Sequence, residues 1–130
     1  RTAEREIGKL RKETPVIVID FHAEATSEKT ALAWHLDGKA SAVLGTHTHV
    51  QTADERVLPG GTAFITDVGM TGPSESVIGV RREDAIARFL TQRPRKFEIP
   101  KGPVHIDAVV IDIDAKTGKA NSIERIHLTS

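Results

Sequence analysis

The chain of 130 residues has room for a single domain, and its 18 basic residues balance 18 acidic ones. Because no net field would attract polyanions, we expect neither duplex nucleic acid nor a membrane surface as a partner. The absence of cysteine excludes disulfides and thiolate metal sites, which leaves His, Asp, Glu and Asn as metal ligands.

The first part of the chain predicts alternating helices and strands. Residues 3–10 place apolar side chains on one helix face. The β-branched run at residues 16–19 is typical of a strand buried on both faces. A helix is expected over residues 26–38, and the short apolar run at residues 42–44 indicates a second strand.

The second part of the chain predicts one more buried strand, a helix and a closing hairpin. Residues 62–66 are expected to form the strand, and the glycines of residues 69–73 indicate a loop after it. A helix over residues 83–90 follows, and residues 104–114 and 123–128 alternate as paired strands do. The expected buried stripe of the helix comprises Ala85, Ile86, Phe89 and Leu90. Together these elements predict an α/β layered fold with mixed strands.

Polar side chains follow each of the three predicted strands of the first 70 residues. His22 follows the first, His47 and His49 follow the second, and Asp67 follows the third. Ligand sites in α/β sheets gather at these carboxyl ends. His47 and His49 are two positions apart, so in an extended segment both imidazoles project to one side. The pattern therefore predicts a histidine metal site at this sheet edge.

Other titratable residues have weaker signals. Glu24 and Asp67 are candidates for acceptors that orient a ligand histidine, and surface or capping roles fit them equally well. His35 lies in a helical pattern, while His105 and His127 lie in the closing hairpin. We interpret these three histidines as structural.

Four linked runs of the sequence resemble the YmdB-type bacterial calcineurin-like metallophosphoesterases. The resemblance covers about residues 15 to 130, and its Gly-x-His-x-His element is a hallmark of the wider superfamily. The matching runs are residues 20–24 (DFHAE), 45–55 (GTHTHVQTADE), 59–63 (PGGTA) and 66–73 (TDVGMTGP). Because several runs match in order, the resemblance is specific.

This resemblance implies half of a four-layer α/β/β/α sandwich with a mixed sheet. Residues 1–130 would be the C-terminal half of one metallophosphoesterase domain, supplying one sheet and its outer helices. An N-terminal half of similar size would lie outside this sequence. The implied activity is hydrolysis of 2',3'-cyclic nucleotides, with 3',5'-cyclic nucleotides as a further candidate class.

The resemblance also implies a dinuclear metal centre with a bridging hydroxide. His22 and His47 would bind one ion and His49 the other. The ions would be divalent or mixed-valence Fe, Mn or Zn. The carboxylate and Asn ligands and the proton donor of the family have no counterpart here, so no catalytic residue is assigned in this chain, and the isolated fragment is expected to be inactive.

Two alternatives remain open from the sequence alone. His22, His47 and His49 would also suffice for a mononuclear three-histidine zinc hydrolase. A non-catalytic domain for oligomerisation or partner binding is the other alternative. Under the main hypothesis the substrate is a cyclic nucleotide or another small phosphodiester, and the protein is expected to be a homo-oligomer. No apolar stretch approaches the roughly 20 residues of a membrane span, so a cytoplasmic location is expected.

Overall fold

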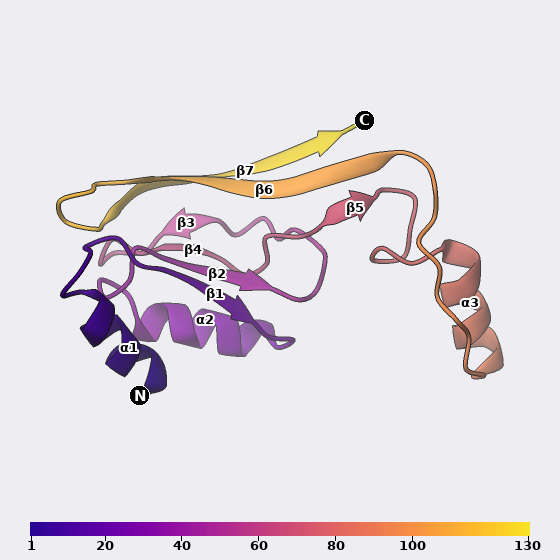
Figure 1. Cartoon of the computed structure of the whole chain (residues 1–130), viewed down its shortest axis with the longest axis horizontal. Coiled ribbons are helices and arrows are strands. Elements are labelled where there is room, and N and C mark those ends of the chain that lie inside the picture. Colours follow the sequence, from indigo (N-terminus) through magenta and orange to yellow (C-terminus); the bar gives the residue numbers. More distant parts are fainter.

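A four-stranded sheet forms the centre of the chain in the computed structural model, which describes residues 1–130 (Figure 1). Its first three strands are parallel and its fourth is antiparallel to its neighbour, as expected for a mixed sheet. In spatial order the strands are β1 (Val18–His22), β2 (Ala42–Thr46), β4 (Ala63–Ile65) and β3 (Arg56–Val57). The predicted strands at residues 42–44 and 62–66 are confirmed by β2 and β4.

Two helices cover one face of this sheet (Figure 1). They are α1 (Thr2–Leu10) and α2 (Thr26–His35), which match the first two predicted helices. Ile7, Ala33, Leu36, Val43 and Phe64 are all buried in the core between the helices and the sheet. Neither these helices nor α3 (Arg82–Thr91) is long and apolar enough to cross a membrane.

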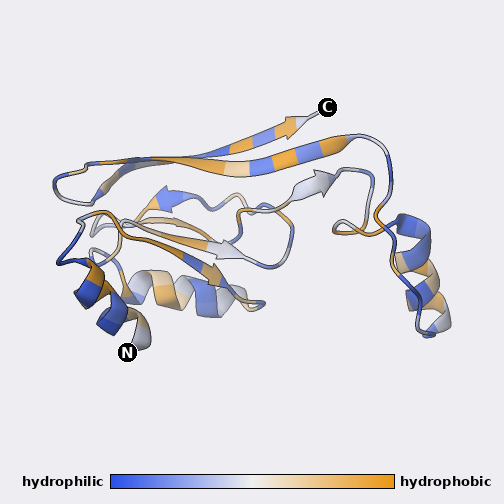
Figure 2. Cartoon of the chain, in the orientation of Figure 1, coloured by the Kyte–Doolittle hydropathy of each residue, from blue (hydrophilic) through white to orange (hydrophobic).

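A second, antiparallel sheet covers the opposite face, where the hairpin lies over the strands (Figure 1). It consists of β5 (Thr71–Pro73), β6 (Val104–Ile113) and β7 (Ala120–Thr129). Ile123 of the hairpin is buried with Ala42 and Ile65 of the first sheet. The chain therefore supplies two packed sheets, and the expectation from the resemblance that it supplies one sheet was wrong. The alternation that predicted the hairpin is visible along β6 and β7 in Figure 2.

Three further expectations need correction. Val18 is 52% exposed because β1 is an edge strand, so this strand is not buried on both faces. Residues 71–73 form β5 instead of a loop, since they pair with β6. The predicted buried stripe of α3 is open, because this helix lies beyond the two sheets (Figure 1). Of its four residues only Ala85 is buried, and those exposed are Ile86, Phe89 and Leu90.

Candidate metal centre

The parallel pairing of β1 and β2 brings two of the predicted histidines together. His22, the last residue of β1, lies opposite Thr46, the last residue of β2, and His47 follows directly. Nε2 of His22 is 3.0 Å from Nδ1 of His47. The two rings are nearly perpendicular, at 86°, with centroids 4.7 Å apart. Residues 25 positions apart in sequence thus meet at the carboxyl edge of the sheet.

A chain of hydrogen bonds between β1 and β2 fixes the tautomer of His22. The hydroxyl of Thr46 donates to Oδ1 of Asp20 over 2.8 Å. Its oxygen can therefore only accept from Nδ1–H of His22, at 3.0 Å. In the neutral ring, Nε2 then has a lone pair, and this lone pair faces Nδ1 of His47, with which it makes a hydrogen bond in the absence of a metal ion. A histidine binds a metal ion through a nitrogen that bears a lone pair, and a hydrogen-bond partner on the other nitrogen commonly fixes this tautomer.

The ring of His49 contacts the loop after β5. Its Nδ1 is 2.9 Å from the carbonyl oxygen of Ile78. A carbonyl only accepts, so Nδ1 bears the proton and Nε2 of neutral His49 is also left with its lone pair. Ile78 has a φ of 47°, which is unusual for a β-branched residue and makes its position a strained one.

The backbone of the histidine loop is also strained. His47 has a φ of 111° and His49 a φ of 66°, a region that residues other than glycine seldom occupy. The amide of Thr48, between them, donates to Oδ2 of Asp67 over 2.9 Å. The same oxygen accepts from Nζ of Lys29 at 2.8 Å, and both side chains are completely buried. This buried ion pair anchors the loop and so holds its backbone in the strained conformation.

Asp67 and Glu24 differ in what they contact. Burial raises the pKa of Asp67, but hydrogen bonds from Lys29 and from the amides of Thr48 and Gly69 outweigh it and lower the pKa overall. Asp67 is therefore an ionised anchor for the backbone and contacts no histidine ring. Glu24 does reach a ring, with Oε2 2.8 Å from Nε2 of His47, from a side chain that is 83% exposed.

Gly45, two positions before His47, allows β2 to lie close to the backbone at the end of β4. A Cβ atom at this position would lie 1.7 Å from the carbonyl oxygen of Thr66, a backbone atom. It would also lie 2.9 Å from the side chain of Lys29. Only glycine fits here, so the first residue of the Gly-x-His-x-His motif serves packing as much as chemistry.

The donor atoms fit a shared metal ion, although the chain does not complete a site. Two nitrogens that bind one ion at about 2.0–2.1 Å lie roughly 2.9–3.4 Å apart, and the pair formed by His22 and His47 is 3.0 Å apart. No group of three His, Asp or Glu side chains in the chain could hold a metal ion.

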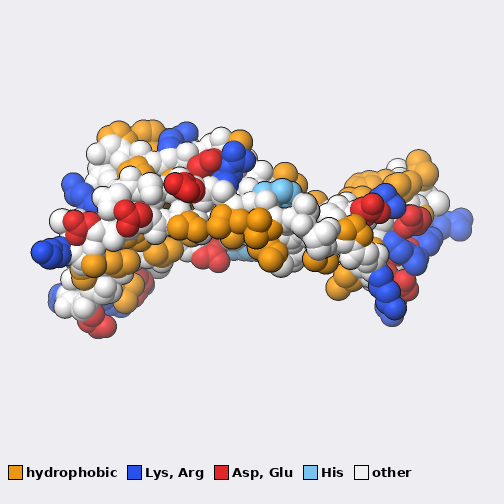
Figure 3. Space-filling model, turned by 90° about the horizontal axis from the view of Figure 1, so that it is seen from above, with side chains coloured by type: hydrophobic (Ala, Val, Ile, Leu, Met, Phe, Trp, Pro, Cys, Tyr) orange, Lys and Arg blue, Asp and Glu red, His pale blue; other side chains and the backbone are white.

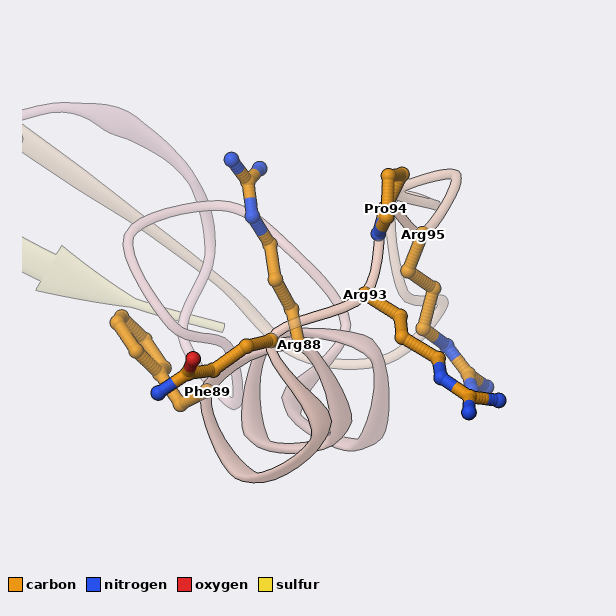
Figure 4. Close-up of a pocket in the computed structure, with 6 residues that line it drawn as sticks. Arg88, Phe89, Arg93, Pro94 and Arg95 are labelled. Atoms are coloured by element: carbon orange, nitrogen blue, oxygen red, sulfur yellow. The ribbon is translucent and has the colours of Figure 1, made fainter.

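Two of the hollows differ in their relation to the histidines. One, of about 410 Å³, is on α3 and is lined by Arg88, Phe89, Arg93 and Arg95 (Figure 4), with no histidine in its lining. The other, of about 760 Å³, is lined on one side by His49.

The larger hollow also brings together two histidines that we interpreted as structural and an aspartate that no sequence pattern singled out. His105, Asp107 and His127 line its wall. The signal that could have found them is the hairpin register, which places Asp107 opposite His127.

The family model for YmdB-like proteins matches residues 1–126. The chain belongs to the YmdB-like protein family. This membership confirms the resemblance inferred from the sequence motifs, and the family's phosphatase relatives share the mixed α/β architecture described above.

Curated and solved relatives of the YmdB-like chain include proteins named as a phosphodiesterase and as a phosphatase. It is 60% identical over 124 residues to the 2',3'-cyclic-nucleotide 2'-phosphodiesterase of Bacillus subtilis, covering 95% of this chain and 47% of that protein. The crystal structure of a novel phosphatase from Mycoplasma pneumoniae matches with a TM-score of 0.91 and 39% identity, over 98% of this chain and 45% of that one. A hypothetical protein from Thermus thermophilus matches with a TM-score of 0.86 and 44% identity, over 97% of this chain and 50% of that one. The chain thus spans about half the length of these relatives.

Proposed function

We propose that this YmdB-like chain is part of a metal-dependent phosphodiesterase that hydrolyses cyclic nucleotides. The activity named for the Bacillus subtilis relative supports 2',3'-cyclic substrates, and 3',5'-cyclic nucleotides are a second class to be tested. The observation that supports the proposal best is the presentation of ligand nitrogens. Two histidines, His22 and His49, donate Nδ1–H to acceptors, so Nε2 of each neutral ring bears the lone pair with which it would bind a cation.

His22 and His47 would hold one transition-metal ion and His49 a second, with iron, manganese and zinc all suited to imidazole ligands. Two observations favour two sites over a mononuclear three-histidine site: the three histidines do not form a group that could hold one ion, and the ring of His49 is held by Ile78. When bound, such ions neutralise charge on phosphoryl oxygens and make water a better nucleophile.

In this proposal the residues of this chain hold the metal ions and orient the histidines that bind them. Asp20 and Thr46 keep His22 in one tautomer, while Asp67 fixes the loop that bears His47 and His49. We further propose that a segment of similar length completes the domain, because the relatives are about twice as long. That segment would supply the bridging carboxylate and the proton donor, since the motifs that the family resemblance implies for these two roles do not occur in this sequence.

The test replaces a proposed ligand in the full-length protein. His47→Ala and His49→Ala should each lower the hydrolysis of a 2',3'-cyclic nucleotide by at least about 10²-fold, because losing a metal ligand removes transition-state charge stabilisation. His35→Ala is the matched control, since His35 is exposed on α2 and paired with a carboxylate, that of Glu4 at 3.3 Å. Wild-type turnover in the His47 and His49 variants would refute the proposal.

A further inference from the structure

The hollow beside His49 has the size and lining of a ligand pocket. Its volume of about 760 Å³ lies within the range of roughly 300–1,000 Å³ typical of small-molecule sites. Met70, Val77 and Ile78 give it an apolar side, and His127 lies in its polar side. Ile78 contributes twice, because its carbonyl also holds His49. The hollow is therefore directly connected to the proposed metal centre.

A buried carboxylate orients the polar wall of this hollow. The side chain of Asp107 is 5% exposed, and its Oδ1 is 2.6 Å from Nδ1 of His127. Its other oxygen is 3.5 Å from Nε2 of His105 and 3.4 Å from the amide of Met70. The carboxylate packs directly against Gly69, where a Cβ would lie 2.4 Å from its Oδ2 and would displace it.

This geometry fixes which nitrogen of His127 is available to a ligand. The carboxylate of Asp107 accepts from Nδ1–H, so Nε2 of the neutral ring is a hydrogen-bond acceptor. The side chain of His127 is 58% exposed and lines the hollow, so this acceptor is accessible to a bound molecule. A buried carboxylate that orients an exposed histidine, as Asp107 orients His127, is typical of preorganised binding sites.

The charges of the hollow argue for an uncharged ligand portion. Its only arginine, Arg125, is paired with Glu55 at 2.8 Å, so it has no free cation of the kind that a second phosphate would need. An apolar side combined with an oriented acceptor suits the base and sugar of a nucleoside instead.

We propose that this hollow binds the nucleoside part of the phosphodiester substrate, with Nε2 of His127 accepting a hydrogen bond from one of its hydroxyl or amino groups. The inference rests on the proposed function and extends it. His127 is then a specificity-determining residue, and Asp107 is the positioning residue that acts through it.

The experiment compares two substrates on the metal-loaded, full-length protein. One is 2',3'-cyclic AMP, and the other is bis(p-nitrophenyl) phosphate, which has no nucleoside. His127→Ala and Asp107→Asn should raise the KM for the cyclic nucleotide by roughly 5- to 10-fold, with kcat within about 2-fold, because one ground-state hydrogen bond is lost. Turnover of the nitrophenyl diester should stay within about 2-fold of wild type in His127→Ala.

Two further variants separate positioning from folding. His127→Gln restores an acceptor near the position of Nε2 and should bring the KM for the cyclic nucleotide most of the way back to the wild-type value. His35→Ala should leave the KM and kcat for both substrates unchanged. An unchanged KM in His127→Ala, or equal losses on both substrates with a lowered Tm, would overturn the inference while leaving the proposed function intact. Absence of turnover of either substrate by the wild-type protein would instead refute the proposed function, and the inference with it.

Discussion

At the residue scale, the hydroxyl of Thr46 is the feature that the account of His22 depends on most. It connects Asp20 to the ring and so decides which nitrogen faces His47. Such partners of ligand histidines typically change metal affinity by about 10- to 100-fold when they are removed. The hydroxyl, more than the bulk of the side chain, is what matters in this interpretation.

Thr46→Val keeps the shape of the side chain and removes both hydrogen bonds. In the full-length protein we expect it to weaken binding of the ion proposed for His22 and His47 by roughly 10-fold or more, measured by titration with Mn²⁺. Thr30→Val is the control, because the hydroxyl of Thr30 only donates to the backbone of Thr26 on an exposed part of α2. Equal affinities in the two variants would contradict the role assigned to Thr46.

The sequence could predict the histidines but not this hydrogen-bond chain. His22, His47 and His49 follow predicted strands in a specific motif, which suffices to single them out. Thr46 reaches His22 because β1 and β2 pair in register, and pairing register is not visible in a single strand pattern. The same reason explains why Asp107 and His127 were not recognised as partners.

At the scale of elements, the buried pair of Lys29 and Asp67 fastens α2 to the loops at the sheet edge. Lys29→Met should lower the free energy of unfolding by about 3–5 kcal/mol, because it leaves the buried carboxylate without its cation. Urea denaturation of the full-length protein measures this. A loss below about 1 kcal/mol would show that the pair does not anchor the loop.

The pH dependence of stability follows from the same pair. The folded-state pKa of Asp67 lies below its ordinary value of 3.8. Its stabilising contribution is therefore fully present above that ordinary value and is lost as the pH falls through the lower, folded-state pKa. Lys29→Met removes the hydrogen bond that lowers this pKa most, so the folded-state pKa of Asp67 should rise towards or above its ordinary value and the acid-side loss of stability should become smaller. Thermal unfolding between about pH 2 and 6 would detect this difference. Coincident profiles would contradict the assignment.

Local patterns predicted which elements exist better than which faces are buried. The strand runs and the hairpin alternation located β2, β4, β6 and β7, because their apolar periods are strong. The apolar stripe of α3 was expected to be buried, yet Phe89 and Leu90 are exposed, since burial depends on a neighbour that the helix pattern does not specify. The strand β5 exists only through its pairing with β6.

At the scale of the whole molecule, the outer face of the hairpin remains open. Exposed apolar side chains run along it in Figure 3. They are Val104, Ile106, Val110 and Leu128, each at least 44% exposed. A layered sandwich would cover such a face with another layer, which agrees with the proposal that further sequence completes the domain.

Residues 1–130 expressed alone should therefore self-associate and show no phosphodiesterase activity above background. The exposed hairpin face favours association, and three neutral histidines cannot offset the charge of two dications. Light scattering and a cyclic-nucleotide assay would measure both properties. A monomeric fragment that turns over substrate as fast as the full-length protein would show that these histidines suffice without other ligands.

Metal content tests the central claim most directly. After metal-replete purification, the full-length protein should contain about two transition-metal ions per chain. Elemental mass spectrometry of the purified protein measures this content. His49→Ala and the double variant His22→Ala/His47→Ala should each retain about one, because the histidines divide between two sites. One ion in the wild-type protein, or two in either variant, would contradict the account.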